Sequence, residues 1–256
     1  MARYGRTFPI RAHTLRFRAG LVKPHTQYFV QALPTGKSSS GTGAVTTSAF
    51  GLTTTTGNHI ALVIGDDSGL AATGITSVTD SYGNTYTKAV GDAGTTALSI
   101  WHAKNITGGA SHTITINWNL VTTSKVSYAG QESSGLNTTA PLDVTASSST
   151  GSPSATISSG TTAATSMASE LVIVAGSWQD ATVTASEGTG YTDLSGNNGL
   201  TLAMMAMESK AVTTTGTQSG TLPLRASTNW IGVIATFKAA GGGPPVNTTN
   251  FFAMFN

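Results

Sequence analysis

Short apolar runs separated by polar turns dominate the chain from about residue 46 onward. Gly, Ser, Asn and Thr fill the turns, while β-branched and aromatic residues are frequent in the runs. This pattern is typical of β-strands, which are shorter than most helices. The clearest strand candidates are residues 60–64, 85–90, 97–104, 112–118, 125–129, 170–177, 200–210 and 230–238. We therefore expect an all-β body over residues 46–240.

One turn stands out within this pattern. The segment TDSYGNT, residues 79–85, places turn-forming residues between β-branched ones. Asp, Ser, Gly and Asn in such a position favour a tight connection between two paired strands. The segment therefore predicts a β-hairpin.

The two halves of the body resemble each other. NHIALVIGDD is similar to SELVIVAGSWQD, VTDSYGNTYTKA to VTASEGTGYTDL, and TALSIWHAKNITGGASHTITI to LTLAMMAMESKAVTTTGTQSGTL, while SKVSYAGQ occupies the place of NWIGVIATFK. The separation is 111 residues from Gly65 to Gly176 and 105 residues from Tyr86 to Tyr191. A repeated order of four elements indicates a duplicated unit. Chance similarity among Thr-rich strands is the alternative.

A duplicated all-β body buries its apolar faces most simply as a sandwich of sheets. We expect a jelly-roll-like or immunoglobulin-like β-sandwich built from two similar halves, residues 46–146 and 168–240. One large sandwich and two tandem small ones both fit the pattern. The stretch 146–167 is almost all Ser, Thr, Ala and Gly, so it is the expected hinge or crossover.

Charge separates an N-terminal arm from this body. Residues 1–45 hold seven basic residues and no acidic one, whereas residues 46–256 hold six basic and 11 acidic residues. Pro9, Pro24 and Pro34 divide the arm into short extended pieces. Its cations alternate with aromatic and aliphatic residues, which favours binding to an acidic protein surface. Nucleic acid is the rival partner, but the arm lacks the continuous Lys/Arg clusters of nucleic-acid tails.

The C-terminal residues 241–256 form a Gly/Pro spacer followed by VNTTNFFAMFN. Three Phe and one Met in six residues predict a docking tail that enters an apolar groove on a neighbouring subunit. Folding back onto an edge of its own sandwich is the alternative. The residues expected to contact partners in the arm and tail are Arg3, Tyr4, Arg6, Phe8, Arg11, Arg16, Phe17, Arg18, Phe251, Phe252, Met254 and Phe255.

Little in the sequence indicates chemistry. The chain has no cysteine, and its five histidines lack the spacing of zinc ligands. Gly36-Lys37-Ser38 resembles the end of a phosphate-binding loop, but Gln31 stands where that loop needs Gly. Asp66, Asp67 and Asp80 fit turn-forming roles better than Ca²⁺ binding. We expect no catalytic residue, no cofactor and no metal.

The aromatic and apolar residues bear on sugar binding, membrane association and secretion. Trp101, Trp118, Trp178 and Trp230 could stack against sugars, although Trp on strands more often belongs to the core. No apolar run approaches the ~18 residues of a spanning helix, and residues 1–20 lack the apolar stretch of a secretory signal. Neither a membrane partner nor ordinary secretion is therefore indicated.

Several of these motifs resemble a known class of module. VTDSYGNTYTKA, IWHAKNITGGASHTITI, AGQESSGLNTTAPLD and NWIGVIATFKAA are similar to the Thr/Ser/Gly-rich β-sandwich modules of bacteriophage virion proteins and bacterial surface proteins. MARYGRTFPIR looks like the basic lead of some phage structural proteins. The resemblance implies a structural or binding module of a virion particle, without catalytic residues. The basic arm and the hydrophobic tail together favour a non-enzymatic capsid decoration or cement protein that binds virion subunits and forms homo-oligomers. A carbohydrate- or receptor-binding tail or fibre module is the alternative.

Overall fold

The computed structural model describes residues 28–38, 43–66, 74–93, 97–118, 126–194 and 204–241, and within these it is all-β with no helix. The expected all-β class is confirmed. Jelly-roll connectivity stays a prediction. The strands are β1 (Phe29–Ser38), β2 (Ala44–Thr46), β3 (His59–Asp66), β4 (Ile75–Asp80), β5 (Thr87–Ala93), β6 (Ala97–Ala103), β7 (Ile114–Trp118), β8 (Val126–Ser133), β9 (Leu142–Ser149), β10 (Ser154–Ala164), β11 (Glu170–Trp178), β12 (Thr192–Asp193), β13 (Met205–Val212), β14 (Thr217–Thr228) and β15 (Trp230–Lys238).

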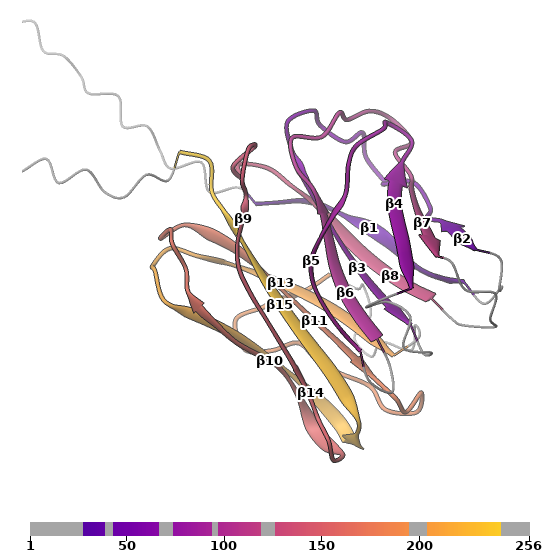
Figure 1. Ribbon diagram of the computed structural model, residues 1–256, viewed down its shortest axis with the longest axis vertical. Helices are drawn as coiled ribbons and strands as arrows, with labels where there is room; N and C mark the ends of the chain where they lie inside the picture. The colour runs from indigo at the N-terminus through magenta and orange to yellow at the C-terminus, as the bar shows by residue number, and fades with distance from the viewer. Residues whose placement is uncertain are drawn as a thin grey trace, which may run out of the picture.

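The strands form four sheets stacked in layers (Figure 1). The first inner sheet has the order β1-β8-β3-β6-β5, and the first outer sheet has the order β2-β7-β4. The second inner sheet has the order β12-β13-β11-β15-β9, and the second outer sheet pairs β10 with β14. Separate apolar cores lie between each outer sheet and its inner sheet, and a third joins the two inner sheets. The molecule is therefore two sandwiches packed face to face through their inner sheets.

Both halves use the same strand order. Strands β1, β8, β3, β6 and β5 of the first half correspond to β9, β15, β11, β13 and β12 of the second. The β2–β7 pair corresponds to β10–β14, and an isolated bridge between Ala185 and Leu224 takes the place of the β4–β7 pair. Strand β6 packs against β15, and β13 packs against β8, so the halves contact each other reciprocally. This topology supports the internal repeat.

The position of the inner sheets explains their continuous apolar runs. Every residue of β3 and of β11 is buried because both faces of each inner sheet are covered. Along β3, Ala61 and Val63 enter the core between the two halves, while Ile60 and Leu62 enter the core of the first sandwich. Alternate side chains of one strand thus contribute to two different cores.

The boundary expected between arm and body is wrong, because part of the expected arm of residues 1–45 belongs to the sandwich. Residues 29–38 form β1, which pairs with β8 along the edge of the first inner sheet. Pro34 lies at an irregularity between Leu33 and Gly36, and an edge strand tolerates proline because one side of it needs no ladder hydrogen bond. Leu33 is almost fully buried, which fixes β1 to the core.

The expected hairpin at residues 79–85 is wrong. Strand β4 pairs with β7 in the outer sheet, whereas β5 pairs with β6 in the inner sheet. The turn therefore connects two sheets across the edge of the sandwich. The Asp80 side chain accepts backbone N–H groups of the turn, and the Asn84 side chain donates to Asp80 and binds the Thr107 backbone of a neighbouring loop.

The expected crossover at residues 146–167 is also wrong, because most of it forms strands. It contributes the end of β9 and all of β10. Ser and Thr can form exposed strands, and Ile157 anchors β10 to the core of the second sandwich. The connection between the two halves is the shorter segment 134–141 that joins β8 to β9.

Candidate functional site

The first and last described residues lie together at one end of the molecule, which we call the attachment pole. The Ser134 backbone N–H donates to the Tyr28 carbonyl at 2.8 Å, and the Ala240 N–H donates to the Gly135 carbonyl at 2.8 Å. Because Ser134 and Gly135 are adjacent, the start of β1 and the end of β15 are held side by side, on the same side of the view in Figure 1. Residues 1–27 and 242–256 therefore both connect to the body at this pole.

All twelve residues predicted to contact partners lie outside the described residues. What the structure supplies is the place where their segments join the body. Residues 1–27 carry six basic residues and no acidic one, while the rest of the chain carries seven basic and 11 acidic residues. The cationic arm and the uncharged aromatic tail thus begin within one small area of a weakly acidic body.

An apolar groove opens beside the attachment pole, between β1 and the β12–β13 edge of the second inner sheet. We call it the β1 groove, and its first hollow has a volume of about 510 Å³. Its walls are mainly apolar, with polar and charged residues on the β12–β13 side: Tyr28, Phe29, Ala32, Leu171, Leu194 and Ala211, with Thr192, Asp193, Ser209 and Lys210. A second hollow of about 520 Å³ continues past Pro34 to Leu52 and shares Ala32 and Leu194 with the first. Phe29 is 47% exposed and Leu52 is 64% exposed. Large apolar side chains this exposed mark a surface suited to a partner.

A carboxyl pair lies close to the pole. Burial raises the pKa of Glu170 to about 7, and its contact with Asp143 acts in the same direction. Burial also acts to raise the pKa of Asp143, but hydrogen bonds from Ser166 and Glu170, with the nearby Lys238 ammonium, lower it overall. The Asp143 carboxylate accepts the Ser166 N–H and hydroxyl, and Glu170 accepts the Met167 N–H at 3.2 Å. The two side chains therefore bind the short connection between β10 and β11.

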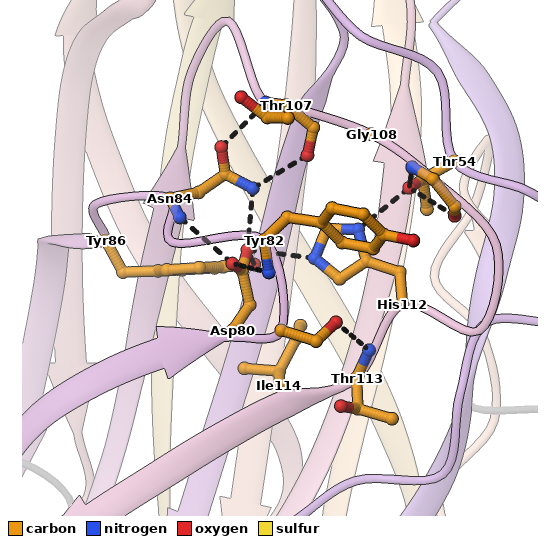
Figure 2. A network of polar contacts seen from close by, with 12 residues as sticks. Thr54, Asp80, Tyr82, Asn84, Tyr86, Thr107, Gly108, His112, Thr113 and Ile114 are labelled. Carbon is orange, nitrogen blue, oxygen red and sulfur yellow. Dashed lines mark hydrogen bonds and ion pairs between the residues drawn. The ribbon is translucent and has the colours of Figure 1, made fainter.

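A polar network joins the β4–β5 connection to the loops beside it (Figure 2). The Asp80 carboxylate accepts backbone N–H groups of Tyr82 and Asn84 at 3.0 and 2.9 Å, and the Tyr86 hydroxyl at 3.2 Å. His112 Nε2 lies 2.9 Å from the same carboxylate. Burial raises the pKa of Asp80, but the hydrogen bonds from His112, Asn84 and Tyr82 outweigh it and lower the pKa to about 2.

Thr54, His112 and Asp80 contact one another in the sequence hydroxyl, imidazole, carboxylate, which is the arrangement of a catalytic triad. Thr54 Oγ1 lies 2.8 Å from His112 Nδ1, on the side of the ring opposite Asp80. However, Thr54 is 3% exposed, and the side chains of His112 and Asp80 are fully buried. Thr54 Oγ1 also accepts the Gly109 N–H at 3.0 Å. A substrate cannot reach a hydroxyl enclosed in this way, so the network is a structural link between loops.

Two histidines meet between the halves. His59 Nε2 lies 3.3 Å from His102 Nδ1, and both rings pack against Phe237 of β15. Burial and the neighbouring His102 lower the pKa of His59 far below its usual value. Burial and the charge of Lys104 lower the pKa of His102 to about 4. The pair is thus held neutral, and sequence spacing gave no sign of it because the two residues lie on different strands.

The remaining motifs have structural roles in the described residues. Trp118, Trp178 and Trp230 are buried, and Trp101 is half-buried with its indole N–H donating to Ser99, so they offer no exposed sugar-stacking platform. Gly36-Lys37-Ser38 ends β1 in a ladder with β8 rather than forming a loop before a helix. These positions therefore carry no sugar or phosphate site.

No metal cluster or membrane-spanning helix is present in the described part of the chain. No three His, Cys, Asp or Glu side chains gather there to hold a metal ion. Asp66 ends β3 in the inner sheet and Asp80 ends β4 in the outer sheet, while Asp67 lies outside the described residues. These residues also include no helix that is long and apolar enough to cross a membrane.

Comparison with known proteins gives no family. The sequence matches no family model, and neither a curated protein nor a solved structure matches it significantly. The fold and the site therefore define the protein by themselves, as a double β-sandwich with two chemically different segments and an apolar groove at one end.

Proposed function

We propose that the protein is a non-enzymatic structural module that attaches to neighbouring subunits of a larger assembly through residues 1–27 and 242–256. The observation that carries this proposal is the attachment pole, where Tyr28 and Ala240 are held against adjacent residues. Two segments that leave from one point can contact the same partner surface at once, and such linked contacts bind more strongly than either alone.

The chemistry of the two segments favours a protein partner with an acidic and partly apolar surface. Six cations in residues 1–27 supply attraction to acidic groups, and the Phe residues of the tail supply apolar area. A capsid decoration or cement role in a virion, with homo-oligomers, follows from the sequence resemblance. A carbohydrate- or receptor-binding tail module is the second candidate, and the exposed apolar side chains beside the pole favour the first.

Removal of residues 1–27 tests the proposal. Truncation must stop before Tyr28, because Tyr28 is buried in the core between the halves. We expect the chain of residues 28–256 to keep its thermal melting temperature and to lose co-sedimentation with the assembly isolated from its native source. An Arg-to-Lys arm that keeps every charge is the control, and it should co-sediment normally.

Two results would contradict the proposal. Normal co-sedimentation of the truncated chain would show that the arm is not the anchor. Tighter binding of the peptide 1–27 to duplex DNA than to the assembly, with a steep loss of affinity on adding salt, would favour a nucleic-acid partner instead.

A further inference from the structure

We propose that the β1 groove is the receptor for residues 246–256 of a second copy of this chain. The inference rests on the proposed function and names the surface that the tail contacts. Its basis is the combination of a mainly apolar groove, an uncharged aromatic segment, and the place where the body ends at Ala240, at the pole beside the groove.

The groove has the shape and chemistry of a site for an extended peptide. Its two hollows are neighbours that share Ala32 and Leu194 as wall residues, and β1 contributes to both. From Tyr28 to Thr35 the strand rises roughly 3.3 Å per residue, so the walls that it contributes extend over about 23 Å. Phe29 and Leu52 lie exposed along this groove. A peptide of seven or eight extended residues would cover them.

The segment 246–256, VNTTNFFAMFN, meets the requirements of such a groove. It contains no charged side chain, so it brings no side-chain ion into the groove, whose own charged residues Asp193 and Lys210 lie on the β12–β13 side. In an extended conformation successive side chains point to opposite faces, which puts Phe251 and Phe255 on one face and Phe252 and Met254 on the other. One face can fill the groove while the other remains available to a further subunit.

The direction of the chain favours a second copy over the same chain. Strand β15 ends at the attachment pole, and β1 begins at that pole and runs away from it. To enter its own groove, the chain would have to reverse within residues 241–245, where Pro244 and Pro245 favour an extended course. The ten residues from Gly241 to Phe251 span up to roughly 33 Å, which reaches a neighbouring molecule.

In each copy the β1 groove lies beside the pole at which the body connects to residues 242–256. Two copies that meet pole to pole can therefore exchange tails reciprocally, and such an exchange closes as a two-fold pair. The expected product is a homodimer whose two grooves are both filled.

Disulfide trapping in the full-length chain tests this directly, because the chain has no cysteine of its own. One variant carries Ala32→Cys and another carries Phe255→Cys, and the two are mixed under mild oxidation. We expect a covalent heterodimer on a non-reducing gel. Adding Leu52→Arg to the Ala32→Cys variant, which places a charge in the exposed wall, should lower its yield by about tenfold. Adding Thr85→Arg, an equally charged change at an exposed site in the β4–β5 connection, outside the groove walls, should leave the yield unchanged.

The same cysteines separate the alternatives. A double variant with Ala32→Cys and Phe255→Cys that gives only an internally linked monomer would show that the tail fills its own groove, and would overturn the inference. The inference would also be overturned if no disulfide formed either in the mixture of the two single variants or in the double variant. If co-sedimentation with the native assembly still depends on residues 1–27 in those cases, the proposed function stands and only the receptor assigned to the tail is lost.

Discussion

At the scale of single residues, Asp80 shows how much one buried carboxylate can organise. It contacts four residues of the connection and of the neighbouring loop, although no ladder hydrogen bond joins β4 to β5. The matching position in the second half is Ala185, and there the Gly188 N–H donates instead to the Glu208 carboxylate of β13 at 2.8 Å. The Asp80 network is therefore a local solution of the first sandwich.

Replacement of Asp80 by Ala should lower the free energy of unfolding by about 3–5 kcal/mol, because it leaves buried donors and the buried His112 without their partner. Urea denaturation at pH 7 measures the change. Asp180→Ala is the matched control, since Asp180 is exposed and its carboxylate accepts the N–H and hydroxyl of Thr182. An equal effect of both substitutions would contradict a structural role of the Asp80 network.

The match between Gly65 and Gly176 shows the limit of sequence alignment at this scale. A β-carbon on Gly65 would meet Met205 of the other half, whereas one on Gly176 would meet Ile157 and Leu222 of its own sandwich. The two glycines thus face opposite sides of their sheets and are not equivalent. A shift of one residue in a strand exchanges its faces, and apolar runs buried on both faces give no signal against such a shift.

At the scale of elements, strands with continuous apolar runs were predicted well and Ser/Thr-rich strands were not. The runs at 60–64, 170–177 and 230–238 coincide with β3, β11 and β15, because burial on both faces demands apolar residues throughout. Strands β9 and β10 contain mainly small polar residues, which are equally typical of loops. In β14, Gly220, Leu222 and Leu224 alternate as buried positions, and that alternation was a usable signal.

Close packing of elements gives a second prediction. Gly232 in β15 lies so near the backbone of β10 that a β-carbon would overlap the Ser158 carbonyl. Gly232→Ala should lower the free energy of unfolding by about 1–3 kcal/mol, since the second outer sheet must move away from the inner sheet. Gly151→Ala is the control, because nothing lies within 4 Å of its added methyl group. Thermal melting of both variants measures the difference, and equal melting temperatures would refute this view of the layer contact.

At the scale of the whole molecule, the contact between the two sandwiches contains the neutral His59–His102 pair. The unfolded chain binds protons on these histidines near pH 6.5, whereas the folded chain resists protonation until about pH 4 at His102. Their stabilising effect is therefore complete above pH 6.5 and is lost as the pH falls towards 4. Glu170 and Glu208 act in the opposite direction, because burial raises their pKa values to about 7. Their contribution to the stability of the folded protein is lost as the pH rises from 4.5 to 7.

A substitution isolates the histidine effect from that of the carboxyl groups. Between pH 7 and pH 5 the His102→Gln variant should lose about 1–2 kcal/mol less of its free energy of unfolding than the unmodified chain. Urea denaturation of both chains at the two pH values gives this difference, in which the contributions of Glu170 and Glu208 cancel. Identical pH dependence would mean that His102 titrates normally in the folded protein.

The attachment pole distinguishes one end of the second sandwich from the other. The turn between β9 and β10 lies at the end of the second sandwich remote from Ala240, since Ser149 pairs with Ile231 near the start of β15. Gly151 in this turn is exposed and has open space around it. If both end segments hold the body to a surface, this turn lies at the end of the body that points away from that surface. A peptide inserted there would be displayed away from whatever surface holds the protein.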